Sequence, residues 1–511
     1  MAKRKPSGNR DPVPGSPWLL WAWAPFYIAA LAFQHDRIPD GICNDTAEEA
    51  LRGLYLVKGP KFEVITFAIG NSAETLYLYL LGLMATLLSP TTIAVQITSW
   101  IFAIVTIALL IRVCRRLNPN LPSWVPLLLG TSSVWLFHYA RSGLRAIAAP
   151  VFLLVVWLLL DRAEEVGERR LPAVLCGAAL GLSIYAYTSC RILVPAFLVY
   201  GAIRIVTGGA ARGALTRLYA FVALGAFVVS IPNLVFFIHS PLEFLLRGGY
   251  VLQGTFSDKM GHLLWTLLLP FYYPSVYASI SGRTFLIDGV SAGLVAAGIR
   301  PVHLLVAAAV LLGFARAWTG RSKATTLFML CVWVCGTLML GITGPSLTRL
   351  LILLPVYLAL AAMGVAVVLE RWPQAHAVVA VSLGAVLLMD ARAYFVLLPA
   401  SLQSSFDFSP AATPIGKRAQ ELAAAGKRVI CVVAKDANVV RYLTYGHEDR
   451  VSVAEFYFRP LSAAEIPVRQ FAPSTILIER NSRFEPYAAQ FPAAWRDTSH
   501  ERFEEIHLPA P

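Results

Sequence analysis

Long apolar runs make up most of this chain and restrict what it can fold into. Each run holds roughly 16 to 22 residues with few charges, the length that a helix needs to cross a hydrocarbon core of about 30 Å. Mean hydropathy is +0.62 and only 14% of the residues are charged, which excludes an ordinary soluble domain. The sequence predicts an all-α polytopic membrane protein with about eleven spans, near 17–33, 92–113, 122–138, 146–161, 171–187, 191–206, 218–238, 302–318, 325–342, 350–369 and 375–393.

The distribution of Lys and Arg orients these spans. Short cytoplasmic loops carry an excess of basic residues, and the N-terminal tail, 1–16, is basic as well. The clusters after alternate spans are Arg112, Arg115 and Arg116; Arg162, Arg169 and Arg170; Arg204, Arg212 and Arg217; and Arg316, Arg321 and Lys323. The segments 34–90 and 239–300 are then predicted to be external. No small-residue cleavage site follows Phe33, so we expect the first span to be uncleaved.

Both external segments contain apolar stretches that are short for a span. Thr75–Leu88 and His262–Leu269 are expected to be helices that lie along the outer interface. If Thr75–Leu88 crossed instead, the basic cluster at Arg112 would be external. Phe285–Gly298 contains several glycines and an aspartate, so we expect a surface or re-entrant segment there, with a further span as the alternative.

The composition changes after the last predicted span. We therefore divide the chain into a membrane module, 17–394, and a small external α/β domain, 395–511. Short apolar runs predict strands and one helix in the second part: strands at Arg428–Ala434, Val451–Phe458 and Thr475–Glu479, and a helix at Ile415–Ala425.

Net charge and cysteine content exclude other classes of function. The formal net charge is +13, but no nucleic-acid-binding motif accompanies it, so we assign the positive charge to cytoplasmic loops and anionic lipid headgroups. The seven cysteines are scattered and form no CxxC pair, so no metal cluster is predicted. Cys43 and Cys190 are both predicted to be external, and a disulfide between them is a hypothesis.

Six ionisable residues fall on the predicted external face, where basic residues are otherwise few. Such groups near a membrane have a high free energy without partners and therefore suggest a functional site. Asp45 precedes an amphipathic stretch, where it or Asn44 caps a helix or, alternatively, Asp45 acts as a general base. Glu74 complements the dipole of the helix that follows or pairs with Asp45 around an acceptor hydroxyl. The full set is Asp45, Glu74, Arg141, Arg145, Arg191 and Arg349.

The four arginines favour recognition of phosphate. Arg141 and Arg145 are four residues apart before a predicted span, so we expect them to share one face near a helix N-terminus, where anions are favoured. Guanidinium groups match phosphate oxygens; contact with lipid headgroups is the alternative. His138, Tyr139, Tyr185 and Tyr187 lie at the same level and are weaker candidates for sugar or lipid contacts. For the tyrosines, and for Tyr272 and Tyr273, an interfacial aromatic belt is the other interpretation.

Several of these segments together resemble a known family. The carriers of the resemblance are Asp45–Gly59, Ala73–Leu83, His138–Pro150, Gly181–Arg191 and Ser346–Pro355. In order and placement they are similar to bacterial polyprenyl-phosphate-dependent glycosyltransferases of the GT-C superfamily, in the family 39-like group of protein mannosyltransferases and aminoarabinose transferases. The resemblance implies a multi-helix membrane module with surface helices in a long first external loop. It also implies that the family's first-loop acid corresponds to Asp45 and its second acid to Glu74, with Glu48 or Glu49 as further acids one turn after Asp45.

The resemblance implies an enzyme of the bacterial inner membrane with an extracytoplasmic site. Its donor would be a polyprenyl-phosphate-linked sugar and its acceptor a lipid, glycan or protein. Charge stabilisation of the leaving phosphate is assigned to Arg141, Arg145, Arg191 and Arg349, and deprotonation of the acceptor to Asp45. One displacement with a single base implies inversion at the anomeric carbon. No cofactor or metal is predicted, although some relatives bind a divalent ion.

Other functions remain as alternatives. A transporter or flippase for a lipid-linked solute would show repeat symmetry and charges deep in its spans, and neither is evident here. A ligase of lipid-linked glycans would use the same donor class and the same arginines. A non-enzymatic protein whose external domain binds a partner is the third alternative.

Overall fold

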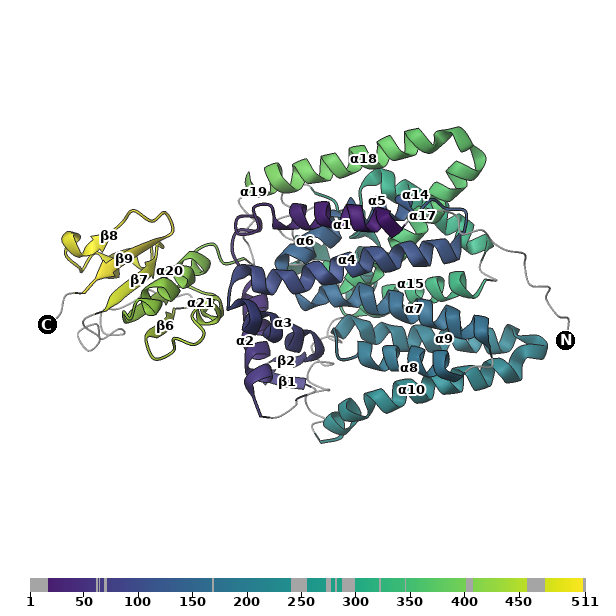
Figure 1. The fold of residues 1–511 in the computed structure, drawn as a ribbon, viewed down its shortest axis with the longest axis horizontal. Coiled ribbons are helices and arrows are strands. Elements are labelled where there is room, and N and C mark those ends of the chain that lie inside the picture. Colours follow the sequence, from purple (N-terminus) through teal and green to yellow (C-terminus); the bar gives the residue numbers. More distant parts are fainter. Residues whose placement is uncertain are drawn as a thin grey trace.

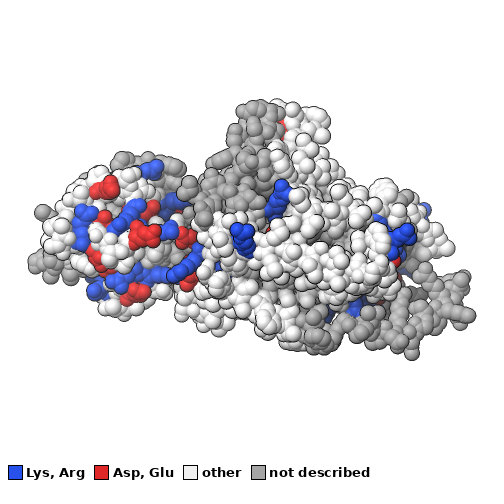
Figure 2. Space-filling model, turned by 90° about the horizontal axis from the view of Figure 1, so that it is seen from above, with Lys and Arg blue, Asp and Glu red and all other residues white. Residues whose placement is uncertain are grey.

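The protein is a bundle of long helices that carries a small mixed domain at one end (Figure 1). The computed structural model describes residues 17–508 apart from 61–62, 64, 69–70, 168–169, 240–254, 273–276, 281–282, 287–298, 321–322, 345, 401–407 and 457–473. Elements of the first predicted loop lie between the bundle and the C-terminal domain in Figure 1. Charges of both signs cover the C-terminal domain in Figure 2, whereas most of the visible bundle surface is uncharged.

Within the described residues, seven helical segments are long and apolar enough to cross a membrane. They comprise α4 (Thr92–Leu117), η1 and α7 (Arg145–Val166), η2 and α9 (Thr188–Thr207), η3 and α10 (Gly209–His239), α15 (Ala324–Ile342), α16 to α17 (Leu347–Arg371), and η5 to η6 around α18 (Pro373–Leu397). Three further predicted spans form shorter apolar helices: α1 (Pro17–Ala32), α8 (Arg170–Ser183) and α14 (Leu304–Thr319). The structure therefore supports a polytopic helical module, and the number eleven stays a prediction.

The predicted span at 122–138 is wrong as a single helix. The chain forms α5 (Trp124–Thr131) and then α6 (Val134–Ser142). Ser133 separates the two, because its backbone is extended and its side chain accepts a hydrogen bond from the Leu136 backbone amide. A serine that caps a new helix in this way ends the preceding one.

Close helix crossings in the bundle depend on glycine. α14 and α17 meet at Gly313 and Gly364, where an added Cβ would come within 1.7 Å of the Leu360 carbonyl oxygen and 1.9 Å of the Ala309 carbonyl oxygen, respectively. Small residues at such crossings let backbones approach, which gives apolar helices their packing energy in a lipid environment.

The first predicted external loop contains two helices and a hairpin. α2 (Asn44–Lys58) is followed by β1 (Ile65–Ala68), β2 (Asn71–Glu74) and α3 (Leu76–Leu88), and the two strands pair antiparallel. α3 agrees with the helix predicted at Thr75–Leu88. α2 and α3 touch at Gly53 and Gly82, because an added Cβ on Gly82 would lie 2.1 Å from the Gly53 carbonyl oxygen. This crossing fixes the position of α2, and with it the acidic residues at its start.

Several spans end in the predicted cytoplasmic charges. These span ends meet at the end of the bundle opposite the first predicted external loop. Arg204 at the end of α9 pairs with Glu164 at the end of α7 at 2.7 Å. Arg116 at the end of α4 pairs with Glu165, and Glu370 at the end of α17 accepts a hydrogen bond from Asn118 at 2.9 Å. The basic clusters and the first loop thus occupy opposite ends, as the charge pattern predicts.

The second predicted external segment is described only in part. α12 (Phe256–Leu268) includes most of the helix expected at His262–Leu269, and a hairpin of β3 (Tyr277–Ile280) and β4 (Arg283–Leu286) follows it. The expectation for Phe285–Gly298 falls largely outside the described residues, which leave out 287–298.

The C-terminal region folds into the predicted α/β type of domain. Its mixed sheet has the order β6-β5-β7-β9-β8, with β5 parallel to β6 and β7, and β9 antiparallel to β7 and β8. The predicted strands correspond to β5 (Val429–Val433), β6 (Val451–Glu455) and β7 (Thr475–Glu479), and the predicted helix to α20 (Ala412–Ala424). α21 (Ala437–Leu443), β8 (Arg496–Asp497) and β9 (Phe503–His507) were not predicted, because they are short or interrupted by charges.

This domain is attached to the chain segment that precedes α2. The Ile42 amide donates to Thr413 Oγ1 at 2.9 Å, and Cys43 forms a β-bridge with Phe408. Lys417 pairs with Asp36 at 3.0 Å. The segment that leads into α2 is therefore held by the C-terminal domain.

Replacement of Gly82 by Ala tests the α2–α3 crossing. The new Cβ would overlap the Gly53 carbonyl oxygen, and overpacking of this kind costs about 1–3 kcal/mol. We expect a lower melting temperature for purified Gly82→Ala. Gly384→Ala, also within a helix, is the matched control because an added Cβ there meets nothing within 4 Å. Equal melting temperatures for the two variants would contradict the crossing.

Candidate functional site

Glu74 lies between two arginines at the end of β2. Its carboxylate accepts from Arg145 at 3.2 Å and from Arg191 at 2.9 Å, and the Thr188 hydroxyl donates to it at 2.9 Å. The Glu74 residue is only 2% exposed. Its alternative role as a first-turn residue of the following helix is wrong, since Glu74 belongs to β2 and α3 begins at Leu76. The hairpin, η1 and η2 thus meet at one buried carboxylate.

Glu49 is a second buried carboxylate at the same site. Its Oε1 lies 2.8 Å from Arg145 Nε, so Arg145 bridges Glu49 and Glu74. Burial raises the pKa of Glu49 to about 7, because the loss of hydration outweighs the lowering by Arg145, and Asp45 raises it further. Glu48 instead pairs with Arg52 on the same helix. The resemblance left Glu48 and Glu49 as equals, and the packing of α2 against η1 decides between them.

Asp45 lies in the first turn of α2 and is exposed. The interpretation of Asp45 or Asn44 as the helix cap is wrong, because the cap residue is Cys43 and no side chain caps the helix. Asp45 acts electrostatically on both Glu49 and Arg145. The adjacent Thr46 donates to the Ser142 carbonyl at 2.9 Å, which holds the start of α2 against the turn that precedes Arg145.

Arg141 and Arg145 do not share one helix face, contrary to expectation. α6 ends at Ser142, Gly143 adopts a positive φ of 78°, and Arg145 begins η1. Arg141 is 1% exposed and donates to the carbonyls of Ala30, Leu31, Phe33 and Ile38. The turn thus sends Arg141 toward the segment after α1 and Arg145 toward the acids.

Arg349 lies on α16 (Leu347–Leu350), which packs against η2, the short helix that carries Arg191. Its guanidinium donates to the Thr343 carbonyl at 2.9 Å, and it is half-buried. Among the described residues, no carboxylate pairs with Arg349. Arg191, whose side chain is 30% exposed, and Arg349 are thus more accessible than Arg145.

The four aromatic candidates divide between the site and the surrounding packing. The Arg145 guanidinium lies 5.7 Å from the centre of the Tyr187 ring. Tyr185 is buried and donates to the Val229 carbonyl of α10 at 2.8 Å, so it is not part of a lipid-facing belt. Tyr139 bonds to Thr348 at 2.5 Å, and His138 lies 3.3 Å from the Tyr394 hydroxyl. Tyr272 is exposed, whereas Tyr273 falls outside the described residues.

Neither a metal centre nor a disulfide is formed by the described residues. No group of three His, Cys, Asp or Glu side chains is placed to hold a metal ion there. Cys43 and Cys190 are both buried free thiols, so the hypothesis of a disulfide between them is not supported.

Chemically, the arrangement combines a buried network with one exposed acid, Asp45, and two partly exposed arginines, Arg191 and Arg349. The two carboxyl groups of Glu49 and Glu74 pair with the two guanidinium groups of Arg145 and Arg191, which compensates the free-energy cost of burying the acids. Asp45 at the surface offers a proton acceptor, while Arg191 and Arg349 offer guanidinium groups for an anion.

The fold places the chain among polytopic membrane proteins of known architecture. It is similar to the structure of ArnT from Cupriavidus metallidurans bound to undecaprenyl phosphate, with a TM-score of 0.58, 11% identity and coverage of 98% of this chain and 100% of that chain. The structure of the same protein in the apo state is also similar, with a TM-score of 0.54, 12% identity and coverage of 96% of this chain and 100% of that chain.

The archaeal oligosaccharyltransferase AglB from Archaeoglobus fulgidus, in complex with an inhibitory peptide and a dolichol-phosphate, is also similar, with a TM-score of 0.50, 11% identity and coverage of 90% of this chain and 70% of that chain. No protein-family model and no curated protein matches the sequence. At these identities the likeness shows an ArnT-like fold, and membership of family 39 stays a prediction.

The raised pKa of Glu49 predicts how stability depends on pH. Because the folded protein retains this proton to a higher pH than the unfolded chain, the resulting stability is present below about pH 4.5 and is lost as the pH rises to about 7. Glu49→Gln lacks this titration, so its melting temperature relative to the native protein should rise between pH 5 and 8. Leu51→Met on the same helix changes no titrating group and should show a constant difference. A constant difference for Glu49→Gln as well would contradict the raised pKa.

Proposed function

We propose that this protein transfers a sugar from a polyprenyl-phosphate carrier to an acceptor at the end of the bundle that carries the first loop. The observation that carries the proposal is the buried Glu49–Arg145–Glu74–Arg191 network with exposed Asp45 beside it. Support comes from the ArnT-like fold, since one of the similar structures holds undecaprenyl phosphate and the AglB structure holds dolichol-phosphate. Both ligands join a long isoprenoid chain to a phosphate.

The reaction is one displacement at the anomeric carbon. Asp45 takes the proton of the acceptor hydroxyl as its oxygen forms the new bond to the sugar. The bond between the sugar and the phosphate oxygen breaks, and polyprenyl phosphate leaves with both electrons of that bond. Arg191 and Arg349 stabilise the charge that develops on the phosphate. A single displacement inverts the anomeric configuration.

Arg145 and Glu74 position the reacting groups in this scheme. Both carboxylates that pair with Arg145 are buried, so Arg145 acts mainly through them rather than on the phosphate. Glu74 holds one guanidinium nitrogen of Arg191 and thereby orients the remaining donors. Arg141 is left out of the phosphate site, because it is 1% exposed and backbone carbonyls hold its Nε and Nη1 against the segment around the end of α1.

The site is further proposed to face the extracytoplasmic side of a bacterial inner membrane. Support comes from the paired basic residues at the opposite end of the bundle, which match the charge bias of cytoplasmic loops. A lipid-linked glycan ligase would use the same residues, and the acceptor distinguishes the two reactions.

Replacement of Asp45 tests the proposed base. In proteoliposomes supplied with undecaprenyl-phosphate-linked pentoses and hexoses and a membrane lipid extract as acceptor, the native protein should release free undecaprenyl phosphate. Asp45→Asn should slow this release about 100-fold or more, the range expected for a general base. Glu48→Gln, three residues further along α2, is the control and should retain activity. An Asp45→Asn protein with full activity would defeat the assigned role.

Binding of the carrier tests Arg349 without turnover. Loss of a charged hydrogen bond should weaken binding of undecaprenyl phosphate to purified Arg349→Gln roughly tenfold or more. Arg371→Gln, at the other end of the helical segment Leu347–Arg371, should bind like the native protein. Unchanged affinity in Arg349→Gln, measured by isothermal titration in detergent, would remove Arg349 from the phosphate site.

A further inference from the structure

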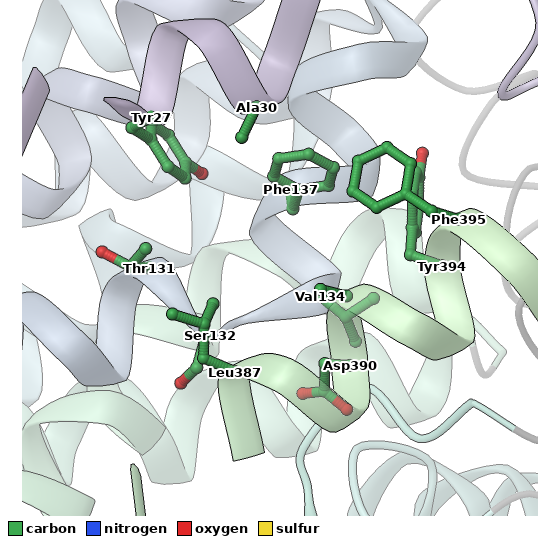
Figure 3. A pocket seen from close by; sticks show the side chains of 11 residues that line it. Tyr27, Ala30, Thr131, Ser132, Val134, Phe137, Leu387, Asp390, Tyr394 and Phe395 are labelled. Carbon is green, nitrogen blue, oxygen red and sulfur yellow. The ribbon is translucent and has the colours of Figure 1, made fainter. Parts of the chain in front are cut away.

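A cavity lies between α1, α5, α6 and α18, and none of the residues of the carboxylate–arginine network lines it (Figure 3). Its volume is about 80 Å³ and its lining is mostly apolar. α1 and α18 flank it, and both carry large exposed apolar side chains, Phe26 at 77% and Leu388 at 72%. Such outer surfaces face hydrocarbon in a membrane protein. The lining residues that matter here are Tyr27, Phe137, Asp390, Ala391, Tyr394 and Phe395.

Two polar groups in this lining have no hydrogen-bond partner among the described residues. Tyr27 is 3% exposed, and its hydroxyl is buried and unpaired. The Asp390 carboxyl, on a helix that is apolar enough to span the membrane, is half-buried and has no partner there either. A buried polar group without a partner costs free energy, and an ionisable residue at membrane depth marks a functional site by default.

One wall of the cavity is aromatic and continues to a buried cation. The Arg141 guanidinium lies 5.7 Å from the ring centre of Phe137, 5.8 Å from that of Tyr394 and 5.5 Å from that of Phe395. Arg141 therefore rigidifies this wall and does not face the Glu74 network, which Arg145 reaches from η1. The cavity and the proposed sugar-transfer site thus lie on different sides of the Gly143 turn.

We propose that this cavity binds one apolar chain of a membrane amphiphile, whose hydroxyl or ammonium group donates a hydrogen bond to the Asp390 carboxyl. The aromatic wall contacts the apolar chain. The Asp390 carboxyl accepts a hydrogen bond from the head group, which gives this carboxyl the partner that it lacks among the described residues. This inference is independent of the sugar-transfer proposal, because it uses none of the same residues.

Photolabelling of the full-length protein in lipid nanodiscs tests the site. The probes are three hexadecyl chains that carry a diazirine and differ only in their head: an alcohol, a primary amine and a methyl ether. The alcohol or the amine should label peptides that contain 131–137 or 387–395, about fivefold more than the methyl ether, the order of one hydrogen bond. Whichever of the alcohol and the amine labels these peptides more strongly identifies the head group of the bound amphiphile. Equal labelling by all three probes, or labelling elsewhere only, would overturn the proposal.

Two substitutions test the hydrogen bond to Asp390 and the space of the cavity separately. Asp390→Leu should reduce labelling by the preferred probe to the level of the methyl ether. The neighbouring Met389→Leu is the control, because Met389 is 58% exposed and does not line the cavity. If Asp390→Leu does not fold, as judged by gel filtration, Ala391→Phe, which fills the cavity, should abolish labelling by every probe. Native labelling in a folded variant of either kind would contradict the site.

Discussion

The position of the candidate site depends on one buried carboxylate, that of Glu74. It joins the hairpin before α3 to the starts of two spans through Arg145 and Arg191. A carboxylate that is 2% exposed has a low free energy only while it is paired. Removal of either guanidinium would leave charge uncompensated, so the loop and the bundle are coupled at this point. The second acid, Glu49, extends the coupling to α2.

This coupling explains how a surface loop provides precise geometry. Asp45 itself is exposed, but its helix is held by Thr46 on the Ser142 carbonyl, by Glu49 on Arg145 and by the crossing at Gly53. The C-terminal domain holds the preceding segment through Ile42 and Cys43. The proposed base is therefore accessible while its backbone is fixed from several sides, which sugar transfer would require.

The local pattern of the sequence predicted much of the fold and part of the site. Apolar length gave the helices, and the charge bias grouped Glu74, Arg145 and Arg191 at one end. Prediction failed where a contact distant in sequence decides the outcome. Ser133 breaks a helix that hydropathy alone joins, and Arg141 turns away because the carbonyls after α1 attract it. The roles of Asp45 and Arg349 stay predictions.

Sequence by itself determined that this chain is a membrane protein with a charged end, because the length of apolar runs and the charge bias are properties of local stretches of the chain. Only the tertiary structure decided which charges meet. Spacing does not distinguish Glu48 from Glu49 as the partner of Arg145, and it gives no sign that Asp390 and Tyr27 line one cavity. Burial and pairing depend on which distant segments pack together, and a one-dimensional pattern does not contain that information.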